Sequence, residues 1–358
     1  MRTATFAAGV LLLGTVLWDA FETIVLPRTA MRKLRLASVY YRISWRGWMM
    51  AGRGLRSDAR RERYLAIYGP LSVIGLLIVW AIGLITAFAL MRWSRDRVPF
   101  VDVMYRSATT LFTLGSGEGL PHSRFERLMI VVEAGAGIGL LTMVFAYLPV
   151  IYQSFSRREV RLTLLDAWAG SPPAAAEVLQ RAGAARDQLP LDDFFREWEY
   201  WCSDVLESHI SYPALAYFRS QHQRQSWISA LTTVLDVSAL TKVGIGGVSA
   251  WRADLTFAIA RHAAVDLVQV FGMRPDRGVD RLPPDERAAL RRDLEAAGLK
   301  PNDSPDADAE LERLRRSYEP YVAALSNLFL VPLPPWRHAS GARFNWHTSP
   351  KRDGGAHL

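Results

Sequence analysis

Six consecutive residues in the first third of the chain have the types and spacing needed to coordinate a cation through backbone oxygens. They read Thr113-Leu114-Gly115-Ser116-Gly117-Glu118. Glycine adopts positive φ at no steric cost, so alternate glycines let successive carbonyl groups turn toward one axis. Rings of such carbonyls can replace the hydration shell of an ion. We therefore expect the carbonyls of Thr113 to Ser116 to be ligands, with the Thr113 hydroxyl as the innermost one.

The residues before this segment predict the short helix that would position it. Pro99 can open a helix, and its body would run from Phe100 to Phe112, with Thr109 and Thr110 supporting the loop from behind. The negative end of that helix would point at the ion path. Irregular backbone at membrane depth is tolerated only where it lines a water-filled cavity. The alternative is a glycine-rich re-entrant turn that does not conduct.

Long apolar runs on both sides of the segment predict membrane spans. The run from Leu65 to Met91 has 27 residues without a charge, and the run from Leu128 to Gln153 has 26 with Glu133 as its one charge. About 20 residues suffice to cross a bilayer. A third run starts at Thr3 and makes residues 1–27 an N-terminal span. The alternative for it is a cleaved signal peptide, which its flanking residues disfavour.

The net charge of +8 comes from one segment between the first two spans. From Arg28 to Arg63 there are 11 basic residues against only Asp58 and Glu62. The positive-inside rule places this linker, residues 28–64, in the cytoplasm. The N-terminus is then outside and the C-terminus cytoplasmic, in the inner membrane of a cell. Arg92, Arg95 and Arg97 would lie in the outer loop and favour the opposite orientation, but they are outnumbered. A nucleic-acid partner is not predicted, because the basic segment lies between spans.

Spacing within the linker predicts a helix that lies at the membrane surface. Four arginines form one stripe of this helix and are candidate lipid-binding residues that would face anionic headgroups. Aromatic residues such as Tyr40 and Trp48 lie on the other side and would face the acyl chains. The four are Arg35, Arg42, Arg46 and Arg53. The alternative is a linker whose aromatic side chains pack on the segment that follows.

The six-residue segment resembles the potassium-channel signature Thr-Val-Gly-Tyr-Gly-Asp. Pro121, Arg127, Leu128 and Gly137 also fall where simple two-helix bacterial potassium channels carry the same residues. The resemblance covers the predicted pore domain, residues 65–155, and it is to the bacterial potassium channel family, with an extra N-terminal helix. One such loop cannot enclose an ion path, so a channel needs several copies of the chain, and the resemblance implies four of them, a homotetramer. It also implies permeant K⁺ and no other metal or cofactor.

Three residues depart from that signature. Leu114 stands in place of Val, Ser116 in place of Tyr and Glu118 in place of Asp. The first and third changes are mild. In the family the tyrosine ring packs outward and holds the filter walls apart, and serine has no ring to do so. We therefore expect relaxed selectivity between K⁺ and Na⁺.

Other residues of the spans allow two interpretations each. Glu133 is an intramembrane acid, which favours a functional role; it would hydrogen-bond behind the filter to Thr109 or Thr110, or else be a neutral acid at a helix interface. Asp19 and Glu22 would pair with linker arginines, with a transport role as the alternative. Three further residues of the span from Leu128 to Gln153 are candidates for its hinge and gate: Gly137, Phe145 and Pro149. A glycine there equally permits close helix packing.

The remaining chain reads as an all-α cytoplasmic domain, residues 156–331, followed by a tail, residues 332–358, expected to be disordered. Cys202 is the single cysteine, and no spacing predicts a metal site or a nucleophile with its base. The expected fold is thus an all-α membrane protein with three spanning helices and one re-entrant pore loop. The expected function is a cation channel regulated by the helical domain, and not an enzyme. The alternative is a non-conducting membrane sensor or scaffold that retains the pore fold.

Overall fold

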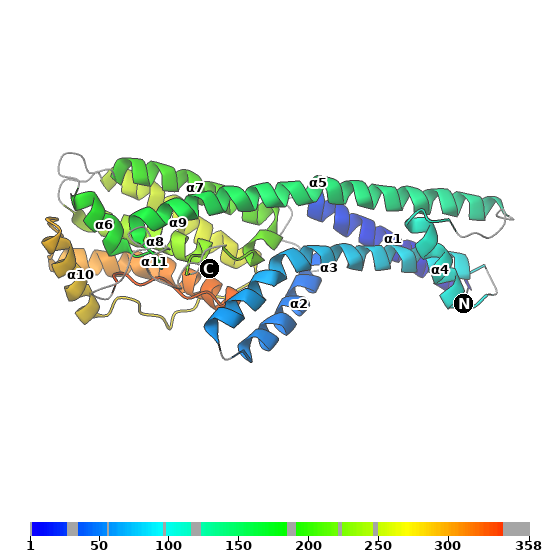
Figure 1. Cartoon of the computed structure of the whole chain (residues 1–358), viewed down its shortest axis with the longest axis horizontal. Helices are drawn as coiled ribbons and strands as arrows, with labels where there is room; N and C mark the ends of the chain where they lie inside the picture. Colours follow the sequence, from blue (N-terminus) through cyan, green and yellow to red (C-terminus); the bar gives the residue numbers. More distant parts are fainter. Residues whose placement is uncertain are drawn as a thin grey trace, which may run out of the picture. The chain divides into compact units, whose positions relative to one another are not determined.

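A computed structural model describes residues 2–26, 35–55, 57–95, 98–115, 123–184, 191–220, 224–245 and 250–338. These residues form helices joined by short connections, and no strand occurs within those ranges (Figure 1). The chain divides into two compact units, Met1–Gln153 and Ser154–Leu358. The all-α class expected from the sequence is confirmed. The finer division into five parts stays a prediction.

Among the described residues, three helices are long and apolar enough to span a membrane, as the sequence predicts. They are α1 (Arg2–Ile24), α3 (Asp58–Trp93) and α5 (Arg124–Ala169). The last two are longer than their apolar runs, because α3 starts in the basic linker and α5 ends in the second unit. Since about 20 residues cross a hydrocarbon core, both helices extend well beyond it.

Helices α1 and α3 approach each other closely at glycines. A Cβ atom on Gly9 would lie 2.7 Å from the carbonyl oxygen of Ala87, and one on Gly83 would lie 2.7 Å from a methyl group of Val16. Small residues at such positions let helix backbones pack tightly in a membrane, where van der Waals contact drives association. The two helices therefore form a fixed pair.

Two acids near the end of α1 join that pair to α2 (Leu36–Arg53). The Asp19 carboxylate accepts the backbone N–H of Ala37 at 3.1 Å, in the first turn of α2, and the indole N–H of Trp80 at 2.8 Å. Glu22 forms an ion pair with Arg35 at 3.3 Å. The expected pairing with a linker arginine is thus present for Glu22. Asp19 instead satisfies a free N–H at a helix start, where a negative charge is favourable.

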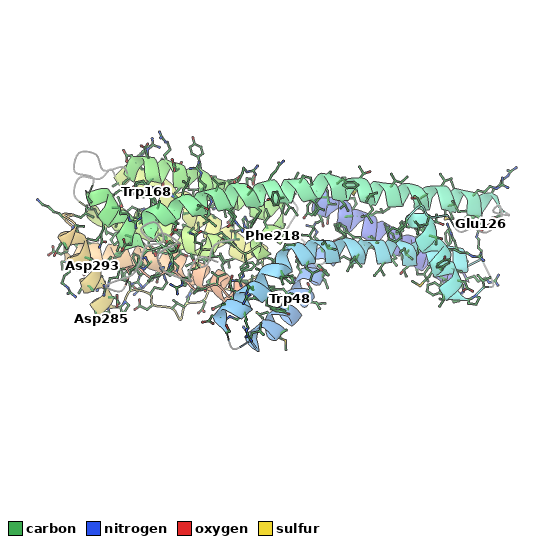
Figure 2. The ribbon with its side chains drawn as sticks, viewed as in Figure 1. Trp48, Glu126, Trp168, Phe218, Asp285 and Asp293 are labelled. Atoms are coloured by element: carbon green, nitrogen blue, oxygen red, sulfur yellow. The ribbon has the colours of Figure 1, made fainter. Side chains whose placement is uncertain are left out.

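The aromatic side of α2 packs on the first part of α3. Trp48, which Figure 2 labels, stacks on Tyr64 with ring centroids 4.4 Å apart. The hydroxyl groups of Ser44 and Tyr68 are hydrogen-bonded at 2.8 Å. The expectation that these aromatics face the acyl chains is therefore wrong, and the alternative of packing on the following segment holds. This part of α3 runs at an angle to the rest (Figure 1), and Pro70 inside the helix accounts for a bend because it removes a backbone hydrogen bond.

The second unit is built around α8 (Trp227–Gly244). Its residues from Trp227 to Thr241 are all buried, which is typical of a helix at the centre of a bundle. Helices α9 (Ala250–Val270), α11 (Pro305–Phe329) and α6 (Ala175–Ala184) pack against it. The other elements are α7 (Leu191–Ser211), which packs on α9, the short η2 (Pro213–Tyr217) and α10 (Pro284–Ala296).

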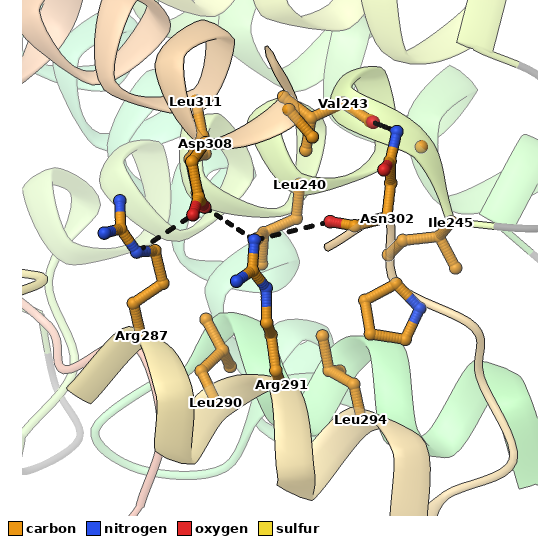
Figure 3. Close-up of a pocket in the computed structure, with 13 residues that line it drawn as sticks. Leu240, Val243, Ile245, Arg287, Leu290, Arg291, Leu294, Asn302, Asp308 and Leu311 are labelled. Carbon is orange, nitrogen blue, oxygen red and sulfur yellow. Dashed lines mark hydrogen bonds and ion pairs between the residues drawn. The ribbon is translucent and has the colours of Figure 1, made fainter. Parts of the chain in front are cut away.

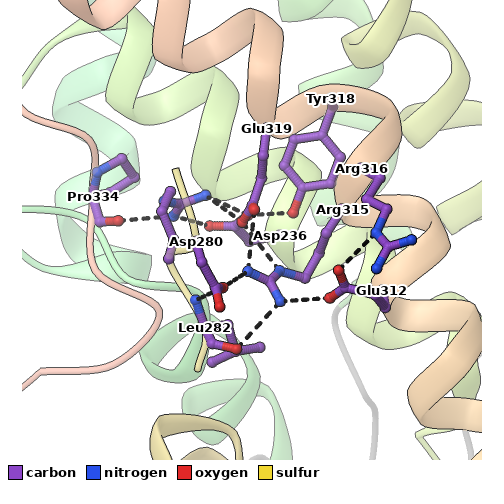
Figure 4. Close-up of polar contacts among 10 residues, drawn as sticks. Asp236, Asp280, Leu282, Glu312, Arg315, Arg316, Tyr318, Glu319 and Pro334 are labelled. Carbon is purple, nitrogen blue, oxygen red and sulfur yellow. Dashed lines mark hydrogen bonds and ion pairs between the residues drawn. The ribbon is translucent and has the colours of Figure 1, made fainter. Parts of the chain in front are cut away.

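A buried polar network closes one side of this bundle. The Asp236 carboxylate receives Arg281 at 2.6 and 3.1 Å and the Tyr318 hydroxyl at 2.6 Å, and Arg281 also donates to the Pro334 carbonyl at 2.8 Å (Figure 4). Trp336 is 3% exposed. Residues 332–338, expected to be disordered, are therefore packed on the bundle. The rest of the predicted tail lies outside the described residues.

Candidate pore segment

The short helix before the glycine-rich segment forms as predicted. α4 (Phe100–Leu111) follows Pro99 and carries Asp102 in its first turn, where a negative charge favours the positive end of the helix. After the helix the chain turns tightly, because Thr113 N–H donates to the Thr110 carbonyl at 3.0 Å and Leu114 N–H donates to the Thr109 carbonyl at 2.8 Å. The start of the segment is thus tied by hydrogen bonds to the last turn of α4.

The described part of the segment has alternating left-handed backbone. Thr113 has φ 57° and Gly115 has φ 75°. Gly115 adopts this conformation without strain, as the sequence predicts, whereas a β-branched residue with positive φ is an outlier that surrounding structure must hold in place. Both residues and Leu114 are exposed within a single chain. Ser116, Gly117 and Glu118 lie outside the described residues, as does Pro121.

Glu133 contacts α4 through a residue other than the two threonines expected. It is fully buried on α5, and it forms an ion pair with Arg92 of α3 at 2.5 Å and accepts a hydrogen bond from the Ser107 hydroxyl of α4. The hydroxyls of Thr109 and Thr110 donate instead to the carbonyl of Arg106, at 2.9 and 2.8 Å. The contact behind the pore helix is therefore present, with Ser107 in place of the two threonines.

Arg92 and Ser107 are the residues that the sequence interpretation missed. The sequence predicts Arg92 as a charge of the outer loop, but it is 7% exposed and belongs to the last turn of α3. The available signal was the arginine directly after one uncharged run and the single acid inside the other run. Opposite charges in adjacent spans tend to pair, because an unpaired charge in the membrane is costly.

Gly137 is required by close packing in this structure. A Cβ atom there would lie 1.9 Å from the carbonyl oxygen of Leu111, the last residue of α4, whereas Gly135 and Gly139 would meet nothing within 4 Å. The packing interpretation of Gly137 thus has direct support. The hinge and gate remain a prediction: Pro149 lies inside α5, and Phe145 on the same helix is 69% exposed.

The four candidate lipid-binding arginines do not share one environment. Arg35 is half-buried, pairs with Glu22 and donates to the Thr23 hydroxyl at 3.1 Å, so it is not available to a lipid headgroup. The other three are exposed on α2, namely Arg42, Arg46 and Arg53. Beside them on the same helix are three exposed apolar residues: Val39, Ile43 and Met50. The exposed surface of α2 therefore combines positive charge with apolar side chains.

The second unit offers little to a ligand in the part that the structure describes. A cavity of about 20 Å³ lies between α8, α10 and α11, and Arg287 and Arg291 at its edge both contact Asp308, at 3.5 and 2.5 Å (Figure 3). Such a volume holds about one water molecule. Within the described ranges, no group of three His, Cys, Asp or Glu side chains is placed to hold a metal ion.

Comparison with known proteins identifies the membrane part. Residues 74–153 match the model of a protein family described as ion channel. A curated relative, the uncharacterized membrane protein YdjJ of Bacillus subtilis (strain 168), is 21% identical over 209 residues, which are 55% of this chain and 60% of that protein. No solved structure matches the chain.

The matched residues contain most of α3, all of α4 and the apolar part of α5. They are the two long spans, the short helix and the glycine-rich segment between them. The chain is therefore a multi-pass membrane protein, and its residues 74–153 form a domain that matches an ion channel family.

Proposed function

We propose that this chain is the subunit of a homotetrameric cation channel that conducts K⁺ with relaxed selectivity. The observation that carries the proposal is the left-handed backbone at Thr113 and Gly115, directly after a helix held against α5. Left-handed backbone at alternate positions turns neighbouring carbonyls to one side, as a ring of ion ligands requires. Permeant K⁺ would be the bound ion, and Ser116 in place of tyrosine would loosen the outer sites.

A single chain cannot surround an ion, so the proposal needs several copies. In the most apolar stretch of α5, 6% of the residues are buried within one chain, against 44% in the corresponding stretch of α3. α5 therefore has free apolar surface for lipid and for neighbouring subunits, and Leu141 and Phe145 on it are 55% and 69% exposed. We place the N-terminus outside and the helical C-terminal unit, as a regulatory domain, in the cytoplasm of the cell. The burial of Arg92 supports this orientation, because it removes one positive charge from the outer loop.

Ion flux into liposomes containing the purified protein tests this function. We expect K⁺ flux and a measurable Na⁺ flux, with a K⁺-to-Na⁺ permeability ratio, from reversal potentials, below that of strictly selective channels. Cross-linking in the same membranes would give the number of subunits. A high ratio would refute relaxed selectivity alone, while intact tetramers without any cation flux would favour the non-conducting sensor or scaffold.

A further inference from the structure

Three buried side chains from three different helices meet behind the pore helix. They are Arg92 from the end of α3, Ser107 from the middle of α4 and Glu133 from the first part of α5, with 7%, 0% and 0% exposure. Glu133 is the centre of this cluster, because one carboxylate oxygen receives Arg92 and the other receives Ser107. We call these three residues the clamp.

The clamp and Gly137 hold α4 against α5 at two points one helical turn apart. Glu133 contacts Ser107, and four residues later on both helices Gly137 contacts Leu111. Residues four apart lie on the same face of a helix, so the two contacts are in register along the two helices. Together they fix both the position and the rotation of the last turn of α4, from which Thr113 begins the glycine-rich segment.

The Ser107 hydroxyl also connects this site to the backbone of α3. It lies 2.9 Å from the carbonyl oxygen of Ile85 as well as close to Glu133. The Nε atom of Arg92 is buried without a hydrogen-bond partner among the residues that the structure describes. The polar contact that the Arg92 guanidinium makes is thus the ion pair with Glu133. Removing Arg92 would leave the Glu133 carboxylate buried without its cation, which is strongly destabilising.

We propose that Arg92, a residue outside the pore segment, is a positioning residue for ion conduction. It holds the Glu133 carboxylate in place to accept the Ser107 hydrogen bond, and this bond sets where the ion-coordinating backbone starts. The proposal rests on the proposed channel function, and it adds that α3, which carries Arg92, helps to position the pore segment. Arg92 itself does not touch the ion.

Single-channel recording of tetramers in lipid bilayers tests the proposal. Arg92→Met removes the cation, and we expect the unitary K⁺ conductance to fall by about 2- to 30-fold, the range in which substitutions within buried networks change coupling between distant groups. Arg92→Lys keeps the charge and should lose less conductance than Arg92→Met, because Arg92 contacts Glu133 through one nitrogen and not as a bidentate pair. Arg95→Met is the matched control, because Arg95 lies at the same end of α3 but is exposed and stacks on Phe125.

A double variant separates positioning from general damage. Combining Arg92→Met with Glu133→Gln removes the stranded acid, while the carbonyl oxygen of the introduced amide can still accept the Ser107 hydrogen bond. Conductance should therefore recover in the double variant. Equal loss in the single and double variants would show that Arg92 does not act through Glu133 and would overturn the proposal. Wild-type conductance in Arg92→Met would overturn it as well.

Two further results keep the test decisive. If Arg92→Met does not assemble, Ser107→Ala replaces it. This change removes the contact between α4 and Glu133 without leaving a buried charge unpaired. Ser107→Ala with unchanged conductance would overturn the proposal, and a fall of the same size would support it. Absence of current in the wild-type protein would refute the channel function itself, and the inference with it.

Discussion

Replacing Gly137 by alanine adds one methyl group at the closest contact between α4 and α5. The new Cβ would lie 1.9 Å from the Leu111 carbonyl oxygen. Ordinary carbon–oxygen contacts are about 3.3 Å, so the two helices would have to separate locally by 3.3 − 1.9, or about 1.4 Å. The obstacle is backbone, which cannot rotate away as a flexible side chain would. The displacement would fall two residues before Thr113.

The magnitude follows from two opposing contributions. Overpacking costs about 1–3 kcal/mol or more, and the higher helix propensity of alanine returns up to about 1 kcal/mol. Because the obstacle is backbone, we take the upper end of the overpacking cost and expect a net destabilisation of about 2 kcal/mol. Because sites must be held to about 0.5 Å, K⁺ flux should fall by at least about tenfold.

Gly135→Ala is the matched control in the same helix, two residues away. Its Cβ would meet nothing within 4 Å in the subunit, so only the propensity gain applies and stability should be unchanged or slightly higher. Thermal unfolding in detergent and flux in liposomes measure both effects. If Gly137→Ala melts and conducts like the wild type, the close contact between α4 and α5 is not what the glycine provides.

Two further predictions concern the surface of α2 and the second unit. Changing Arg42, Arg46 and Arg53 together to Gln should weaken the retention of anionic lipid at low salt by roughly 150-fold, at about 1 kcal/mol per charge, and by less at high salt. Native mass spectrometry measures the retained lipid, and the same change at three exposed arginines of the second unit (Arg196, Arg313 and Arg316) is the control. Unchanged retention would exclude lipid binding by this face of α2. Residues 154–338 should fold alone as a soluble helical unit that loses stability below about pH 6.5, because burial and then the neighbouring Arg158 lower the pKa of His209 to about 3. Between about pH 6.5 and pH 3, His209 is protonated in the unfolded chain but not in the folded one, so the free energy of unfolding falls by about 1.4 kcal/mol per pH unit. Urea titrations of His209→Gln should lack this contribution. An equal dependence on pH in the wild type and the variant would contradict the prediction.

The spans and the pore helix were predictable because their signals are local. Two long runs with at most one charge define α3 and α5, and Pro99 with a following apolar segment defines α4. The positive φ of Gly115 is likewise permitted by its residue type, because glycine adopts it without strain. Such features need no knowledge of which face meets which neighbour.

Features that depend on packing were missed or assigned to the wrong side. The periodicity of α2 gives two faces, but it does not say that Trp48 stacks on Tyr64 instead of facing lipid. Arg92 at the end of a run reads equally as a loop charge or a buried partner until Glu133 is placed beside it. The proline-rich residues 332–338 resemble a disordered tail, because their order comes from contacts such as that of Pro334 with Arg281.

The buried position of Asp19 has a consequence for how the protein enters the membrane. Its partner Trp80 lies 61 residues later in the chain, and Ala37 lies 18 residues later. During synthesis, α1 therefore reaches the insertion machinery before either donor does, with an acid that the hydrocarbon core disfavours. We expect α1 to remain beside the translocon until α2 and α3 have emerged, so that the first three helices are released into the bilayer together as a unit.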